Sequence, residues 1–102
     1  MHNAESIEEV RSKLITHKNV LLVFSASWCG PCRVLAPILD MIEEELSGIT
    51  FIKIDVDKIS PKSFSVTSVP TLIRFTGNKE VGRKLGVQSK SDLEAWLQSD
   101  QQ

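Results

Sequence analysis

The sequence is short of cysteine, carries no excess of basic residues and contains no long apolar run, and each shortage excludes a class of protein. With 2 cysteines in 102 residues, it cannot be a disulfide-built scaffold, which needs several bridges to replace a hydrophobic core. The 12 Lys and Arg residues against 13 Asp and Glu leave a formal net charge of -1, whereas a nucleic-acid binder normally carries a basic patch. No segment approaches the roughly 18 consecutive apolar residues that a membrane helix needs. We therefore expect neither a nucleic acid nor a membrane as partner.

What remains is the composition of one ordinary globular domain, and we expect a single domain over residues 1–102. Hydrophobic residues make up 41% of the chain, which suits a single core at this length. The N-terminal segment has no basic region followed by an apolar stretch, as a signal peptide would. Unless the chain is processed from a longer precursor, we expect a cytoplasmic protein. The polar tail over residues 99–102 and His2 near the start are expected to be disordered.

Hydrophobic periodicity predicts alternating helices and strands. Capping residues and apolar stripes predict helices over Ile7–His17, Pro31–Leu46 and Pro61–Phe64, and a last helix that Ser89 and Asp92 open. Unbroken or alternating apolar runs predict strands over Val20–Phe24, Phe51–Val56, Leu72–Phe75 and Val81–Leu85. Pro37 lies inside the second helix, where we expect a kink.

The order of these elements predicts an α/β fold. Val20–Phe24 is apolar throughout, as in a strand that is buried on both faces of a covered sheet. The strand–helix–strand succession around it implies parallel pairing with a right-handed crossover. The turn at Gly77-Asn78 predicts an antiparallel hairpin. The expected architecture is a mixed central sheet with helices on both faces.

Both cysteines lie within the tetrapeptide Cys29-Gly30-Pro31-Cys32, between a buried strand and the first turn of a helix. A disulfide across so small a loop removes little entropy from the unfolded chain, so stability is a poor reason for the pair. Such a pair near a βαβ pattern is typical of a redox motif. Cys29 would lie at the helix N-terminus, where free N–H groups and the helix dipole stabilise a thiolate. Cys32, one turn further on, would be shielded from solvent and could reach the first sulfur.

Three segments together resemble the thioredoxin family over nearly the whole chain: Trp28-Cys29-Gly30-Pro31-Cys32, Ala36-Pro37-Ile38-Leu39 and Val69-Pro70-Thr71. The resemblance implies a thioredoxin fold with a cis peptide bond at Pro70. It implies that Gly30, Pro31 and Pro70 tune the redox chemistry. It further implies that Trp28, Val69, Pro70 and Gly86 line the substrate groove, and Lys53 matches a lysine on the central sheet.

The function implied by this resemblance is that of a disulfide reductase. Cys29 would attack a disulfide in a client protein and Cys32 would resolve the mixed disulfide. Thioredoxin reductase would then re-reduce the Cys29–Cys32 bond with electrons from NADPH. No cofactor or metal would be bound to the chain, and the protein would act as a monomer.

The sequence departs from the family pattern at three places. Val23 replaces a buried aspartate that lies behind the cysteines and is thought to help deprotonate the resolving thiol. Ser25 stands where an aromatic residue is frequent. The segment between Asp57 and Pro70 is about two residues shorter than usual by comparison with the family pattern. Without the aspartate, Cys32 would lose its proton to solvent, to the departing Cys29 or to another group. Lys53 and Asp55 are candidates for that group by their place in the sequence.

Other interpretations of the same residues stay open at this point. A zinc site would need four ligands, and only His2 and His17 remain beside the cysteines, on other elements. A disulfide oxidase or isomerase of the same fold would run the chemistry in the opposite direction. A non-enzymatic binding module would use the groove alone. Trp28 could instead pack in the core, and Lys53 could place its ammonium group in solvent.

Overall fold

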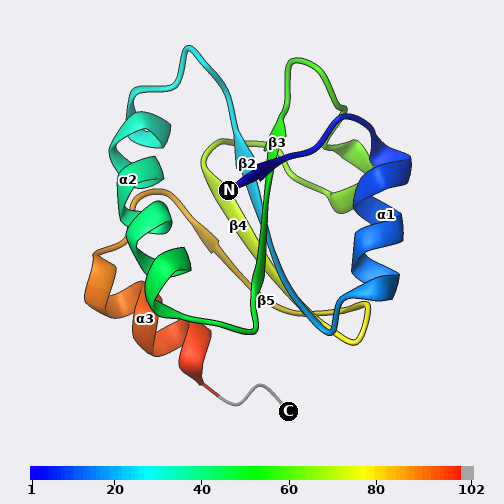
Figure 1. The fold of residues 1–102 in the computed structure, drawn as a ribbon. Helices are drawn as coiled ribbons and strands as arrows, with labels where there is room; N and C mark the ends of the chain where they lie inside the picture. Colours follow the sequence, from blue (N-terminus) through cyan, green and yellow to red (C-terminus); the bar gives the residue numbers. More distant parts are fainter. Residues whose placement is uncertain (100–102) are drawn as a thin grey trace.

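The computed structural model describes residues 1–99; of the expected polar tail, residues 100–102 lie outside the described part. It contains a five-stranded mixed sheet (Figure 1). In spatial order the strands are β1 (His2–Asn3), β3 (Thr50–Asp55), β2 (Asn19–Ser25), β4 (Thr71–Thr76) and β5 (Lys79–Leu85). The pairs β1–β3 and β3–β2 are parallel, and β2–β4 and β4–β5 are antiparallel. The predicted strands, parallel crossover and hairpin are therefore confirmed.

Strand β1 was not predicted, and the expected disorder of His2 is wrong. His2 pairs with Ile52 of β3, and its Nε2 lies 3.0 Å from a carboxylate oxygen of Glu9. Two residues are too few for a recognisable strand pattern. Their order depends on an available edge of β3, which is distant in the sequence.

The helices lie on both sides of the sheet, as predicted (Figure 1). Helix α1 (Ile7–Thr16) and the 3₁₀ turn η1 (Lys62–Phe64) lie on one side, and α2 (Gly30–Glu45) and α3 (Lys90–Gln98) lie on the other. The capping residues explain where two helices begin. Ser6 Oγ accepts a hydrogen bond from the Glu9 amide at 3.1 Å, and Ser89 Oγ accepts one from the Asp92 amide at 3.1 Å.

Each face of the sheet carries its own hydrophobic core, because β2 is apolar from residue 20 to residue 24 and is covered on both sides. Under α1 the core includes Val10, Leu14, Val20, Leu22, Phe24, Ile52, Ile54, Ile59, Val66, Ile73 and Phe75. Under α2 and α3 it includes Leu21, Val23, Leu35, Leu39, Ile42, Phe51, Leu72, Leu93 and Leu97. Successive residues of β2 thus alternate between the two cores, which fixes its register.

Helix α2 contains Pro37, as predicted, and its helical backbone continues past this residue to Glu45. The short helix expected from Pro61 is a single 3₁₀ turn that begins at Lys62. It ends where Ser65 adopts a left-handed backbone with φ of 57°, which a longer helix could not accommodate.

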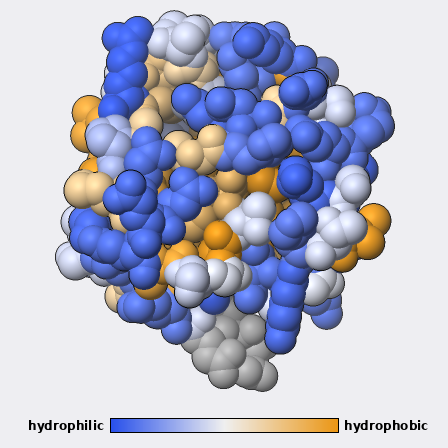
Figure 2. Space-filling model, in the orientation of Figure 1, coloured by the Kyte–Doolittle hydropathy of each residue, from blue (hydrophilic) through white to orange (hydrophobic). Residues whose placement is uncertain are grey.

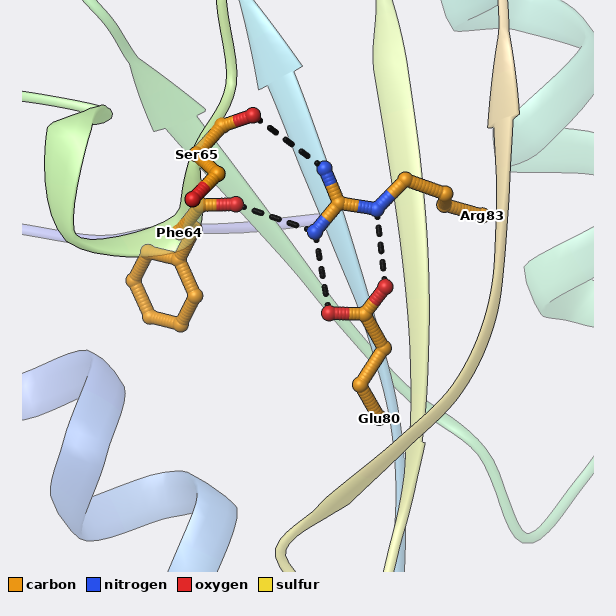
Figure 3. A network of polar contacts seen from close by, with 4 residues as sticks. All are labelled: Phe64, Ser65, Glu80 and Arg83. Atoms are coloured by element: carbon orange, nitrogen blue, oxygen red, sulfur yellow. Dashed lines mark hydrogen bonds and ion pairs between the residues drawn. The ribbon is translucent and has the colours of Figure 1, made fainter.

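An arginine on β5 holds this 3₁₀ turn to the sheet (Figure 3). Arg83 donates from Nε and Nη2 to both carboxylate oxygens of Glu80, at 2.7 and 2.9 Å. It also donates to the main-chain oxygens of Phe64 at 2.9 Å and Ser65 at 3.3 Å. The segment that leads to Pro70 is therefore fastened to the hairpin by a side chain on the far strand.

On the face shown in Figure 2, hydrophilic side chains cover most of the surface and apolar ones show between them, mainly towards the centre. None of the helices within residues 1–99 is both long and apolar enough to cross a membrane.

Candidate active site

The two cysteines form a disulfide at the end of β2, where the chain enters α2. Their Cα atoms lie 5.3 Å apart. Cys29 is the N-cap residue of α2 and has extended backbone angles, whereas Cys32 lies in the first turn. The Cys29 Sγ atom accepts a hydrogen bond from the Cys32 amide at 3.2 Å. Cys29 thus occupies the position at which free amide groups and the helix dipole stabilise a thiolate.

The residues between the cysteines suit a helix start. Pro31 lies within the first turn of α2, where its missing N–H would have no intrahelical partner. Gly30 and Pro31 are both exposed. The first turn of α2 contains no acidic residue, so no carboxylate there opposes a thiolate on Cys29.

Solvent exposure does not separate the two cysteines in the disulfide form. Cys32 is 5% exposed, which confirms the expected shielding, and Cys29 is as little exposed, at 4%. Ala26 completes a small cluster with the two cysteines, and Val56 and Val69 pack against it. These apolar neighbours come from loops that the spacing of the cysteines does not reveal. What distinguishes the cysteines is their position relative to the helix end.

Trp28 covers the edge of the site and does not belong to the core. Its side chain is 66% exposed, and its Nε1 donates a hydrogen bond to Asp57 Oδ2 at 2.9 Å. Asp57 follows β3, and its amide donates to Asp55 Oδ1 at 2.9 Å. Sequence reasoning did not identify Asp57 as part of the site. The sequence offered one indication, which is that Asp57 is an acidic residue just after β3, the strand that pairs in parallel with β2.

The remaining expected site residues lie on two loops beside the cysteines. The peptide bond between Val69 and Pro70 is cis, as the resemblance implied. The Gly86 amide donates to the Pro70 oxygen at 2.9 Å, which places the end of β5 against this loop. Gly86 has φ of 80°, a backbone conformation that favours glycine. The fold therefore brings Val69, Pro70 and Gly86 to the same end of the sheet.

A surface cavity of about 170 Å³ lies on the Trp28 side of the cysteine pair. Trp28 forms one wall of this cavity. The other lining residues follow β3 or precede β4: Val56, Pro61, Val66, Thr67, Ser68 and Val69. Its walls are mainly apolar, with Thr67 and Ser68 as the polar lining residues, a composition typical of ligand-binding cavities.

A second region lies beside Cys32. It contains Val23 and Ser25, which depart from the family pattern, and Lys53, which matches it. Val23 is 3% exposed and pairs in register with Lys53 of β3. Lys53 is half-buried and lines the same cavities as Cys32, so its side chain is not simply a solvated strand lysine. Asp55 does not line these cavities and accepts from the Asp57 amide instead.

The histidines lie away from the cysteines. His2 contacts Glu9, and His17 Nδ1 lies 2.9 Å from the Thr16 hydroxyl oxygen at the end of α1. Within residues 1–99 there is no group of three or more His, Cys, Asp or Glu residues that could hold a metal ion.

Comparison with known proteins identifies the family. The family model described as Thioredoxin matches residues 2–99. The chain belongs to the thioredoxin family. A thioredoxin of Chlamydia trachomatis is 46% identical over 77 residues, 72% of this chain and 74% of that protein. A thioredoxin of Mycoplasmoides gallisepticum is 35% identical over 91 residues, 87% of this chain and 91% of that protein. The solved structure of Plasmodium falciparum thioredoxin has a TM-score of 0.89 and 29% identity, and the match covers 95% of this chain and 96% of that chain.

Family membership gives the cysteine pair its chemistry. Thioredoxins are protein disulfide oxidoreductases, and the bonded Cys29 and Cys32 stand at the end of β2 in a thioredoxin fold. The chain therefore has the thioredoxin-type dithiol–disulfide redox function. The family needs no bound cofactor for this exchange, because the reacting groups are the protein's own sulfur atoms. The resemblance seen in the sequence and the predicted fold are both confirmed.

Proposed function

We propose that this thioredoxin-family protein reduces disulfides in client proteins, with Cys29 as the attacking thiol and Cys32 as the resolving thiol. The observation that carries this assignment is the N-cap position of Cys29, whose sulfur accepts the Cys32 amide hydrogen bond. In the reduced protein the same amide group and the dipole of the 16-residue helix α2 favour the thiolate of Cys29. No residue within 1–99 donates a hydrogen bond to the Cys32 sulfur.

The exchange proceeds through two displacements. The Cys29 thiolate attacks one sulfur of the client disulfide, and the other client sulfur leaves with the electron pair and takes up a proton. Cys32 then loses its proton and attacks Cys29 Sγ, so that the Cys29–client bond breaks and the second client thiol leaves. The client gains two electrons and two protons, and the protein keeps the Cys29–Cys32 disulfide.

The direction of the exchange follows from the residues between the cysteines and from the electron donor. Gly30 and Pro31 form the dipeptide that accompanies reductive members of the family, whereas more oxidising members carry a histidine there. We propose that thioredoxin reductase returns the disulfide to the dithiol with electrons from NADPH. A reducing protein of this kind belongs in the cytoplasm, where protein thiols are kept reduced. It would act there as a monomeric single domain.

Client proteins would bind where Trp28, Val69, Pro70 and Gly86 surround the disulfide. Trp28 offers an exposed aromatic surface that Asp57 holds in place. The loop at Val69 packs against the cysteines, and the Gly86 amide fastens the following loop to it. A client segment lying across these loops would bring its own disulfide to Cys29.

The test is an insulin-reduction assay with NADPH and a thioredoxin reductase, in which NADPH consumption reports turnover. The unmodified protein should support turnover, and Cys29→Ser and Cys32→Ser should each abolish it. Incubation with oxidised clients should give Cys32→Ser stable mixed disulfides through Cys29, and Cys29→Ser none. Adducts found by mass spectrometry mainly through Cys32 would reverse the two roles. A wild-type protein that stays reduced against glutathione at an oxidising poise would instead support the oxidase interpretation.

A further inference from the structure

Cys32 lines two cavities that share several of their lining residues and that no carboxylate lines. An inner cavity of about 10 Å³ is lined by Val23, Ser25, Cys32 and Lys53, among others. An outer, open cavity of about 180 Å³ is lined by Ser25, Cys32, Arg33 and Lys53, among others. Within the described part of the chain, no Asp or Glu lines either space. Asp55 pairs in register with Ser25, but it lines neither space and accepts a hydrogen bond from the Asp57 amide. The spaces beside the resolving thiol therefore offer no carboxylate as a proton acceptor.

Ser25 lines both cavities, and its hydroxyl group has no hydrogen-bond partner among residues 1–99. Ser25 and Thr71 are the two buried polar residues of the described chain, at 6% and 2% exposure. The Thr71 hydroxyl donates to the Ser68 oxygen at 2.7 Å, whereas the Ser25 hydroxyl makes no hydrogen bond to any residue within 1–99. No fully enclosed side-chain oxygen in that range lacks a partner, so water can reach the Ser25 hydroxyl. It lines both cavities.

The sizes of the two spaces suit a short path for a proton. The inner volume of about 10 Å³ is close to what one water molecule needs, and the outer cavity opens to solvent. A serine hydroxyl can accept a proton through its oxygen while it gives its own to a neighbouring water. Ser25, Cys32 and Lys53 line both spaces, so Ser25 lies next to Cys32 at each of them.

The basic side chains of Lys53 and Arg33 line the outer cavity together with Cys32, whereas the N-terminal charge beside the inner cavity is offset by two carboxylates. Lys53 of β3 and Arg33 of α2 line the outer cavity, and Arg33 Nη2 also donates to the Ser27 oxygen at 2.8 Å. The N-terminal ammonium group of Met1, whose residue lines the inner cavity, is paired with Asp40 and Glu43 of α2 at 3.4 and 3.1 Å. Positive charges near a thiol stabilise its thiolate.

We propose that Ser25 relays the proton of Cys32 to solvent during resolution of the mixed disulfide, with Lys53 stabilising the thiolate that remains. This rests on the proposed roles of the two cysteines. The Cys32 thiol passes its proton to the Ser25 hydroxyl, which passes its own to water in the cavity. The Cys32 sulfur then bonds to Cys29 Sγ, the bond between Cys29 and the client sulfur breaks, and the client thiolate leaves with the electron pair and is protonated by solvent.

The experiment follows the two displacements separately. Reduced protein is mixed with one equivalent of dithiobis(nitrobenzoate), and each displacement releases one coloured thionitrobenzoate. The first release depends on reagent concentration and reports attack by Cys29. The second does not, and reports attack by Cys32 on the mixed disulfide. Both rates are measured from neutral to alkaline pH for Ser25→Ala, Ser25→Thr and Ser25→Val, and thermal unfolding shows that each variant is folded.

The Thr and Val variants form the matched pair, because they differ in one hydroxyl and have nearly the same shape. We expect Ser25→Val and Ser25→Ala to slow the second release about tenfold near pH 7, and Ser25→Thr to stay close to the wild type; a relay that water can partly replace contributes less than a dedicated base. The deficit should vanish above about pH 9.5, where a thiol with a pKa of about 8.5 ionises unaided. The first release should not change.

A deficit that persists unchanged at alkaline pH would mean that Ser25 acts only through packing and would overturn the relay. So would a Thr variant as slow as the Val variant, or an Ala variant as fast as the wild type. Lys53→Met should move the pH midpoint of the second release upward, and an unmoved midpoint would remove Lys53 from the proposal. A missing first release would contradict the role of Cys29 instead, so the two proposals fail in different phases.

Discussion

Among the residues around the cysteines, Val23 is the one whose substitution tests both the stability of the site and proton transfer from Cys32. It is 3% exposed, belongs to the core under α2 and α3, and lines the inner cavity with Cys32. Burial of a valine contributes about 1.5 kcal/mol or more to stability. The related family pattern has an aspartate here, which could exchange a proton with the resolving thiol. A valine cannot exchange a proton with Cys32, but its side chain packs in the hydrophobic core.

Val23→Asp should therefore destabilise the protein and speed resolution near neutral pH. If burial raised the pKa of the new carboxyl from about 4 to about 7, the cost at neutral pH would be about 4 kcal/mol. Pairing with Lys53, its register neighbour on β3, would lower that cost. The folded state would bind more protons than the unfolded state between these two pKa values. The cost therefore grows as pH rises from about 4, levels off above the folded pKa, and vanishes well below pH 4 apart from any packing penalty.

Denaturant unfolding from acidic to neutral pH measures this cost, and the second thionitrobenzoate release measures resolution. Val23→Asn is the control, because it introduces a polar side chain of the same shape as aspartate that does not ionise. Its destabilisation should not depend on pH in this range. An aspartate variant as stable as the wild type at pH 7, or one that resolves no faster, would contradict this account of Val23.

Among the helices and strands, those that depend on residues close together in the sequence were predicted correctly. Ser6 and Ser89 cap their helices as the sequence indicated, and the apolar run of β2 is buried on both faces. Strand β1 escaped prediction because its two residues are ordered only by pairing with β3. The predicted short helix is a 3₁₀ turn over Lys62–Phe64, and its end is bonded by Arg83, which lies 18 residues after Ser65. No pattern within the turn indicates that contact.

In the candidate site, too, the features set by neighbouring residues were predicted and those set by strand pairing were not. The spacing of Cys29 and Cys32 and the helix start between them are local, so the sequence alone indicated a redox pair. Asp57 was not identified, because its contact with Trp28 depends on the register of β2 against β3. Ser25 was noted only as a departure from the family pattern. That register brings Ser25 opposite Asp55 and the loop after β3 to Trp28, which no pattern within either segment specifies.

The Arg83 network gives a prediction about the segment before Pro70. Arg83→Met keeps a long apolar stem but removes the donors to Glu80, Phe64 and Ser65. Because the guanidinium is partly exposed, we expect a loss of about 1 kcal/mol of stability. We also expect faster hydrogen exchange at the amides of Ser65 and Val66, which close the turn. Unchanged exchange there would show that the turn does not depend on Arg83.

Glu80→Gln is the companion variant and adds a pH dependence. The hydrogen bond from Arg83 lowers the pKa of the Glu80 carboxyl below its usual value of 4.5. A lowered folded pKa means that the pair contributes stability above about pH 4.5 and loses it as pH falls through the folded value. The contribution is at most about 1 kcal/mol, because the carboxylate is largely exposed. The glutamine variant should show less acid destabilisation between about pH 5 and pH 3 than the wild type, and identical acid profiles would contradict the pairing.

At the scale of the whole molecule, the topology gathers distant segments at one end of the sheet. The cysteines follow β2, Asp57 follows β3, Pro70 precedes β4 and Gly86 follows β5. Exposed apolar side chains are not confined to that end. Leu85 and Val87 flank Gly86 at 58% and 44% exposure, whereas Ile15, at 71%, lies on α1 just before β2 begins. Exposure of an apolar side chain therefore does not by itself identify a client-binding surface. The position of the side chain relative to the cysteines is the better guide.

Leu85→Ser and Val87→Ser should weaken client binding, whereas Ile15→Ser should not. Leu85 pairs with Thr71 directly after Pro70, so a client lying across the disulfide would cover it. Loss of a partly buried aliphatic contact worth about 1 kcal/mol raises KM about fivefold and leaves kcat nearly unchanged, since the contact does not touch the reacting sulfurs. Insulin reduction at varied insulin concentration measures both constants. Ile15→Ser removes a more exposed apolar side chain at the opposite end of β2, so it controls for any general effect of lost surface hydrophobicity. An equal rise in KM for all three variants would show that the rim around Gly86 has no special part in binding clients.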